Sequence, residues 1–204
     1  MDTRTRVGVP VEGFLRCAAL WIMGLSCSAR ADPVVQGLVV ATLGVTIVSE
    51  ALGKAPSRED RASLMVEGGR FDVVPNASNR TAANQLELEY RPGRYLVWKL
   101  KPLIGFGGTA TSSFYGYAGL RLDTFWGPHV VIAPSFALTG YSRGRGKDLG
   151  SPPLLGRSGI DLQYGVSDDV RVGVSVHHMS NGKLLGQRRN PGTAGAGITL
   201  AVAL

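Results

Sequence analysis

Cysteine and long apolar runs are both scarce in this sequence. The only cysteines, Cys17 and Cys27, lie near the start, so the rest of the chain has neither a disulfide framework nor a cysteine zinc site. The longest apolar stretches, 17–27 and 38–48, are well short of the ~20 residues that a membrane-spanning helix needs. With only three histidines, histidine-dependent catalysis also has few candidates.

Glycine is abundant instead. The 204 residues include 28 glycines, about twice the usual share of ~7%, together with 11 prolines and 44% hydrophobic residues. This composition favours a single domain rich in tight turns and excludes a coiled coil, a collagen and a disordered chain. The net charge of +7 suits an anionic surface, which is either nucleic acid or lipopolysaccharide.

The first 31 residues have the pattern of an export signal. Arginines precede the apolar run 17–27, and Ala29-Arg30-Ala31 follows it as a small-x-small cleavage site. We therefore expect a signal peptide over 1–31 and a mature protein that begins at Asp32. A lipoprotein signal ending at Cys27 is the alternative, but Gly24 stands where such signals usually have leucine.

The segment 32–63 precedes the regular part of the sequence, and its structure is left open. Its apolar stretch 38–48 fits an extra strand, a short packed helix or part of an atypical signal. From Leu64 onward, eight segments alternate apolar and polar residues with the period of two that is typical of strands. They are 64–74, 83–91, 94–108, 113–125, 129–141, 157–166, 169–179 and 194–204.

The connectors between these segments alternate in length. Arg91–Arg94, 126–128 and 167–168 predict tight turns, whereas 142–156 and 180–193 are long. Eight strands with short turns at one end and long loops at the other are typical of an outer-membrane barrel. We expect an all-β fold over 64–204, an eight-stranded antiparallel transmembrane β-barrel; a soluble periplasmic barrel is the alternative.

The seventh segment contains the best candidates for chemistry. The period of two places His178 and Ser180 on one strand face, in a row with Val172, Val174 and Val176, so we expect this row to face lipid. Their Cβ atoms would be about 6.5–7 Å apart, close enough for an imidazole to activate a hydroxyl for ester hydrolysis. Two polar residues at the end of a strand, without any catalytic role, are the alternative.

The surrounding motifs extend this pattern. His178-Met179-Ser180-Asn181-Gly182, followed by Asn190-Pro191-Gly192-Thr193, resembles the signature of the outer-membrane lipid A 3-O-deacylase family, and blocks of similarity extend over about 64–204. The resemblance implies an eight-stranded barrel in the bacterial outer membrane. It also implies hydrolysis of the ester that holds the 3-hydroxyacyl chain of lipid A, so that lipopolysaccharide rather than nucleic acid is the partner.

The resemblance also assigns roles to single residues. It implies Ser180 as the nucleophile and His178 as the general base, with Asn181 and Asn190 as donors to the oxyanion, and no metal or other cofactor. The family's catalytic acid is missing, because Ala194 stands at its position. Two other carboxylates, Asp148 and Asp161, are conceivable substitutes.

Three readings of the function follow. The first is an active lipid A deacylase, slowed by the absent acid. The second is a non-catalytic outer-membrane barrel with a structural or lipid-binding role, and the third is a soluble periplasmic binding barrel. The cations of the loops, Arg143, Arg145, Lys147, Arg188 and Arg189, are candidates for contact with lipid A phosphates. Whether the chain forms a homodimer is left open.

Overall fold

Nine strands make up most of the part of the chain that can be described. The computed structural model describes Gly44 and residues 59–73, 81–151, 153–182 and 190–204. The predicted signal peptide 1–31 lies outside these residues, as does the stretch 38–48 apart from Gly44. Within the described ranges, no helix combines the length and the apolar character needed to cross a membrane. The strands are β1 (Ser63–Phe71), β2 (Ala83–Arg91), β3 (Lys101–Thr109), β4 (Phe114–Arg121), β5 (Thr124–Trp126), β6 (Val130–Ser142), β7 (Leu154–Gly165), β8 (Val170–Ser180) and β9 (Thr193–Ala203).

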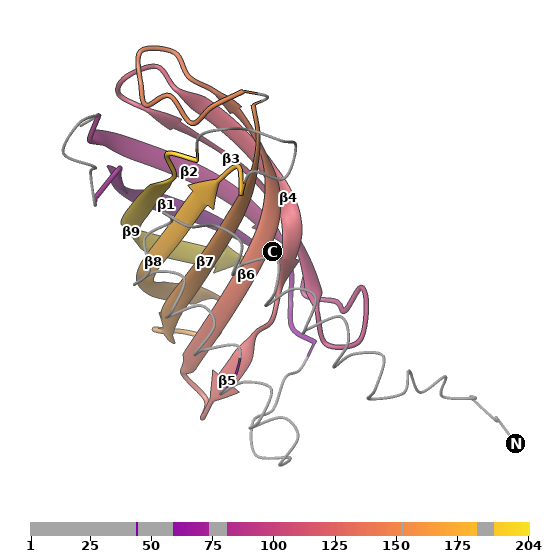
Figure 1. Ribbon diagram of the computed structural model, residues 1–204. Helices are drawn as coiled ribbons and strands as arrows, with labels where there is room; N and C mark the ends of the chain where they lie inside the picture. The colour runs from indigo at the N-terminus through magenta and orange to yellow at the C-terminus, as the bar shows by residue number, and fades with distance from the viewer. Residues whose placement is uncertain (1–43, 45–58, 74–80, 152, 183–189) are drawn as a thin grey trace, which may run out of the picture.

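These strands form one closed antiparallel barrel (Figure 1). β1 pairs with β2 on one side and with β9 on the other, and the pairing of β4 with β6 completes the ring. β5 continues the line of β4 along β6, so the two together form one of the eight strands of the barrel. The predicted eight-stranded antiparallel barrel is thereby confirmed.

The break between β4 and β5 has its cause in the opposite strand. Leu122 and Asp123 interrupt the single strand predicted for 113–125. The N–H of Leu122 donates to the carbonyl of Pro134 in β6, at 3.0 Å, but proline has no N–H with which to return the bond. The ladder therefore loses one bond at this point, and pairing resumes at Thr124.

The strand predicted for 94–108 begins later than expected. β3 starts only at Lys101, because a turn closes just before it, with the N–H of Leu96 donating to the carbonyl of Leu100 at 2.8 Å. Trp98 in this turn has a positive φ of 52°. The connection between β2 and β3 is thus longer than the four-residue turn that the sequence predicts.

The two faces of the barrel wall differ sharply in polarity. Side chains that point outward are apolar and exposed, among them Leu86, Ile104, Phe106, Val174 and Ile198. Side chains that point into the lumen are largely polar and buried, among them Glu67, Glu87, Glu89, Arg91 and Arg157. An apolar exterior around a polar interior is the pattern of a transmembrane barrel and the reverse of a soluble one.

Several buried charges of the lumen are paired. Arg91 lies 2.5 Å from a carboxylate oxygen of Glu89 and 2.6 Å from one of Asp161. Lys101 lies 3.0 Å from Asp123. Glu89 lies on the same strand as Arg91, whereas Asp161 lies on β7, so the pair of Arg91 with Asp161 joins strands that are far apart in the sequence. Removing one member would leave an uncompensated buried charge. The loss of stability would be far larger than the net stabilisation that the intact pair provides.

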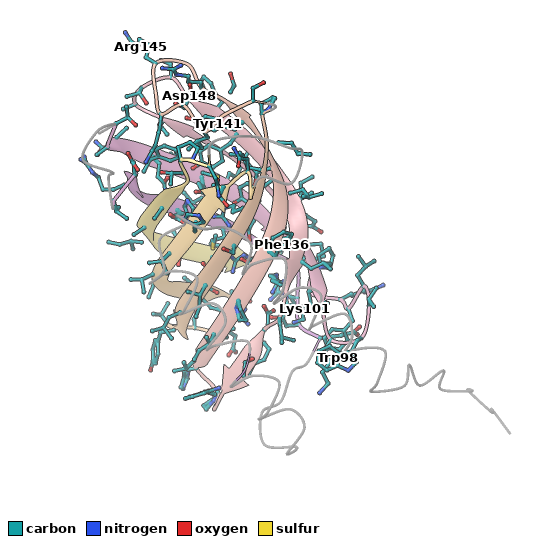
Figure 2. The ribbon with its side chains drawn as sticks, viewed as in Figure 1. Trp98, Lys101, Phe136, Tyr141, Arg145 and Asp148 are labelled. Carbon is teal, nitrogen blue, oxygen red and sulfur yellow. The ribbon has the colours of Figure 1, made fainter. Side chains whose placement is uncertain are left out.

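The two ends of the barrel have different side chains and different connections. Figure 2 shows Trp98 near one end and Arg145 and Asp148 near the other, in the long loop between β6 and β7. The exposed rings of Trp126 and Tyr164 lie at the end that bears Trp98, where the connections are shorter. Aromatic side chains at a barrel end are typical of the boundary between lipid and water.

Two glycines of β4 provide a matched test of how the barrel closes. A Cβ atom on Gly119 would lie 2.0 Å from the carbonyl oxygen of Phe136 in β6, whereas one on Gly116 would lie 3.9 Å from its nearest neighbour, the carbonyl oxygen of Gly105. Gly119→Ala should therefore lower the free energy of unfolding by about 1–3 kcal/mol, and Gly116→Ala should change it by less than about 0.5 kcal/mol. Urea titration of the folded barrel in lipid vesicles measures both. Equal effects would show that this backbone contact does not limit closure.

Candidate active site

His178 and Ser180 lie at the end of β8 that is next to the longer loops. β8 alternates between exposed outward residues and buried inward ones, so Val172, Val174, His178 and Ser180 belong to one outward row, as expected. The valines are exposed, but His178 is only 3% exposed and Ser180 only 9%. The lipid-facing row therefore ends in two covered polar side chains.

The turn that precedes β9 covers the imidazole of His178. A Cβ atom on Gly192 would lie 3.0 Å from Cε1 and 3.3 Å from Nε2 of His178. Gly192 also has a φ of +50°, which side chains with a Cβ rarely adopt. Glycine is therefore required here twice over, for the backbone turn and for its close approach to the ring. This accounts for Gly192 in the Asn190-Pro191-Gly192 motif.

Asn181 and Asn190 join the two ends of the loop between β8 and β9. The backbone N–H of Asn181 donates to Oδ1 of Asn190 at 3.2 Å. The side-chain Nδ2 of Asn181 donates to the carbonyl of Leu149, at 3.1 Å, in the neighbouring loop. Both asparagines are buried. Both thus bind backbone or loop groups beside Ser180.

The strands that flank His178 bring no carboxylate directly opposite it. Its cross-strand partners are Ser158 on β7 and Ala194 on β9. Directly opposite residues in an antiparallel sheet have Cβ atoms about 4.5–5.5 Å apart. Ala194, where the resemblance led us to expect an acid, is therefore next to the imidazole, on the same outward face. Ser158 is a neighbour that the sequence could not reveal, because the pairing of β7 with β8 decides it.

The two substitute acids have different surroundings. Asp161 is buried in the lumen, where it pairs with Arg91, so the barrel wall separates it from the outward face of His178. As a substitute for the missing acid, Asp161 was the wrong expectation. Asp148 is exposed, and it accepts a hydrogen bond from the N–H of Gly150 at 2.9 Å.

One of the loop cations is not available to an external anion. Lys147 is buried, and its Nζ lies 2.6 Å from Asp72, whose carboxylate also accepts a hydrogen bond from Thr193. The expectation that Lys147 contacts lipid A phosphates is therefore wrong. Arg145 is exposed, whereas 188–189 lie outside the described residues.

A family model decides which family these features belong to. The model described as Lipid A 3-O-deacylase (PagL) matches residues 82–203, which is more than half of the chain and includes both ends of the β8–β9 loop. The chain belongs to the lipid A 3-O-deacylase family. The resemblance inferred from the sequence is thereby confirmed. Among the curated proteins, no match was found.

Solved structures agree with this membership at the level of the fold. The crystal structure of the outer membrane enzyme PagL is 16% identical, with a TM-score of 0.54, and the match covers 70% of this chain and 99% of that one. A de novo designed transmembrane β-barrel (13% identity, TM-score 0.49, covering 71% and 98%) and Neisserial surface protein A (12%, 0.47, covering 70% and 96%) were also found. The chain is thus an outer-membrane barrel of the deacylase family.

The orientation in the membrane can be tested with single cysteines. Arg145 lies exposed in the β6–β7 loop, and Arg94 lies exposed between β2 and β3, at the other end. On intact cells, a membrane-impermeant maleimide should label Arg145→Cys, because long barrel loops face outward. It should label Arg94→Cys only after the outer membrane is permeabilised. The reverse result would place His178 and Ser180 at the periplasmic side.

Proposed function

We propose that this protein is an ester hydrolase that removes the 3-O-linked hydroxyacyl chain from lipid A. The observation that carries the proposal is the placement of His178 and Ser180 in one outward row, at the loop end of a barrel of the deacylase family. A nucleophile and a base on the outward face lie on the side of the barrel wall from which a substrate in the membrane would approach. The family description indicates lipid A as the substrate class, and the His-Ser pair indicates ester hydrolysis as the reaction.

The reaction begins with proton transfer within the row. His178 takes the proton of the Ser180 hydroxyl as its oxygen attacks the ester carbonyl, since a neutral serine is a weak nucleophile. The tetrahedral oxyanion accepts hydrogen bonds from Asn181 and Asn190, and each such donor is typically worth about 10²–10³ in rate. The imidazolium then protonates the departing sugar oxygen. Water, activated by the same histidine, releases the hydroxy fatty acid from Ser180.

The covered position of the pair suits this chemistry. The contact of Gly192 with the imidazole limits the orientations that the ring of His178 can adopt. Acyl chains of a bound lipid would lie along the exposed valines of the same row, Val172 and Val174. The outer leaflet is thus the side from which the ester would reach Ser180. Catalysis needs neither a metal nor another cofactor.

Ala194 supports a second candidate function. In a serine hydrolase the carboxylate fixes the tautomer of the histidine and stabilises the imidazolium, and its loss costs on the order of 10⁴ in rate. A barrel that retains His178 and Ser180 without this acid could bind lipid A without turning it over. Mass spectrometry of lipid A from cells with and without the protein separates the two functions. A homodimer has no support from the comparisons, and one chain provides the whole His-Ser pair.

Removing either member of the pair should abolish release of the hydroxy fatty acid. Ser180→Ala and His178→Ala each remove a reacting group from an outward position, so neither change opens a cavity in the lumen. His129→Ala and Ser142→Ala, which change the same residue types away from this row, should retain activity. Lipid A profiles measure all four, with heat-modifiable mobility on gels as the control for folding. Activity in Ser180→Ala would exclude the serine mechanism.

Restoring a carboxylate should raise the rate. Because Ala194 is directly opposite His178, Ala194→Glu places an acid within reach of the ring N–H. We expect deacylation of purified lipid A to increase by up to ~10⁴-fold, while Ala194→Gln, which accepts a hydrogen bond but carries no charge, gains much less. Folded mobility must be unchanged for the comparison. Equal rates in parent, Glu and Gln proteins would show that position 194 does not act on the histidine.

A further inference from the structure

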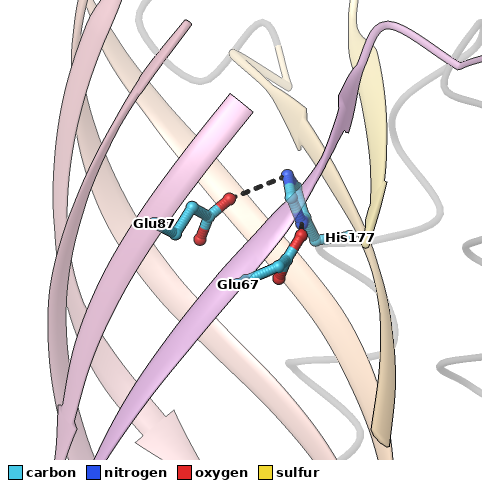
Figure 3. Close-up of side chains that lie close together, drawn as sticks. All are labelled: Glu67, Glu87 and His177. Carbon is cyan, nitrogen blue, oxygen red and sulfur yellow. Dashed lines mark ion pairs between the residues drawn. The ribbon is translucent and has the colours of Figure 1, made fainter. Parts of the chain in front are cut away.

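A second cluster of reactive side chains lies in the lumen, on the opposite face of β8. Glu67 on β1, Glu87 on β2 and His177 on β8 converge there (Figure 3), and each is at most 1% exposed. His177 precedes His178, but adjacent strand residues point to opposite faces. This cluster, which we call the lumen trio, is therefore separate from the proposed ester-hydrolysis site.

The lumen trio has the dimensions of a metal site. One ligand atom from each residue can be chosen so that all three lie within 4.8 Å of one another. Nε2 of His177 lies 3.4 Å from Oε1 of Glu87. Tetrahedral ligands of Zn²⁺, with bonds of about 2.1 Å, are separated by about 3.4 Å. Oε1 of Glu67 lies 3.9 Å from the other ring nitrogen, Nδ1, so the Glu67 carboxylate would move toward Nε2 to complete a set of one nitrogen and two oxygens.

The trio also contains polar atoms whose hydrogen bonding is incomplete. Among the described residues, neither ring nitrogen of His177 has a hydrogen-bond partner, and neither does Oε2 of Glu67. Buried polar atoms normally have a partner, because each one left without it costs about 1–3 kcal/mol. A bound cation would accept the lone pair of the imidazole and that of the carboxylate.

Neighbouring side chains hold the two carboxylates in place. Glu87 accepts hydrogen bonds from the hydroxyls of Tyr115 and Tyr117, at 2.8 and 2.9 Å. Glu67 accepts one from Nε2 of Gln85 at 2.9 Å. Each carboxylate oxygen has two lone pairs, so these bonds leave room for a metal. Outer partners of this kind orient metal ligands and strengthen binding.

Two glycines of β9 make space for the lumen trio. A Cβ atom on Gly195 would lie 2.3 Å from Nε2 of His177, and one on Gly197 would lie 2.6 Å from Oε1 of Glu67. The lumen is thus shaped around these two ligand atoms. Larger residues at either position would push a ligand out of place.

The electrostatics of the lumen favour a cation. Glu67 and Glu87 have one positively charged neighbour among their printed contacts, Arg157, which lies 2.9 Å from Glu87. Arg91 is likewise shared by two further carboxylates. With His177 neutral, Glu67, Glu87 and Arg157 together carry one negative charge in excess, which a bound cation would offset.

We propose that Glu67, Glu87 and His177 bind a divalent transition-metal ion, with Zn²⁺ the best match to the donor set. The ion would clip β8 to β1 and β2 across the lumen, and water would complete its coordination. His, Glu and Glu as ligands suit zinc better than calcium or magnesium, which prefer oxygen alone. The site has no part in the serine chemistry, so its existence does not depend on the proposed function.

Zinc titration of the untagged, folded protein tests the site. After chelator treatment and dialysis, we expect uptake of one Zn²⁺ per chain. Glu67→Gln and His177→Gln should each weaken binding at least tenfold, whereas His129→Gln, a matched change of a histidine outside the lumen trio, should leave it unchanged. Heat-modifiable mobility confirms that each variant is folded.

A measurement on the parent protein covers the case in which a variant does not fold. X-ray absorption at the zinc edge should show one imidazole nitrogen and oxygen ligands at about 2.0–2.2 Å. Absence of zinc uptake by the parent, a zinc shell without imidazole, or binding that survives both Glu67→Gln and His177→Gln would each overturn the proposal. Loss of lipid A hydrolysis in Ser180→Ala protein that still binds zinc would leave the proposal intact and show that the two sites are separate.

Discussion

Closure of the sheet into a barrel commits every strand residue either to lipid or to the lumen. In an open sheet both faces can be solvated. In a closed barrel, a shift of register by one residue would move apolar side chains from the lipid into the charged lumen and charged side chains into the lipid. This constraint explains why the ion pair of Lys101 with Asp123 can form inside a small membrane protein. Charged groups expelled from the lipid face have one remaining place to go, and there they must find partners.

The same constraint separates the two adjacent histidines of β8. His178 faces the side where lipid lies, and His177 faces the carboxylates of Glu67 and Glu87. Two identical side chains on consecutive residues therefore have unrelated surroundings. In the proposed mechanism His178 accepts the proton of Ser180, whereas His177 lies fixed between two carboxylates of the lumen. Sequence adjacency alone would suggest a single site.

The strands were largely predictable from the sequence, because apolar residues at every second position are a direct consequence of one lipid-facing side. The prediction was wrong where a local turn imitates a strand, as at Leu96 and Trp98, and where a partner strand breaks the ladder, as at Pro134. Neither effect can be read from the segment itself. The first depends on one backbone angle and the second on register.

The candidate site, too, was only partly predictable from the sequence. The shared row of His178 and Ser180 follows from spacing within one strand, so the sequence sufficed. The cover over the imidazole and its neighbour Ser158 depend on pairing between strands, and the burial of Lys147 depends on Asp72, a residue distant in the sequence. Contacts of this kind are fixed only when the barrel closes.

The valines of β8 have a consequence for the fidelity of folding. A misregistered β8, shifted by one residue, would still present an imidazole on each side of the wall, because His177 and His178 would only exchange places. The same shift would be costly for the valines and for Arg171. It would move Val172 and Val174 into the charged lumen and expose Arg171 to hydrocarbon. The apolar residues of β8 thus fix its register, and the register in turn determines which histidine faces the lumen and which faces the lipid.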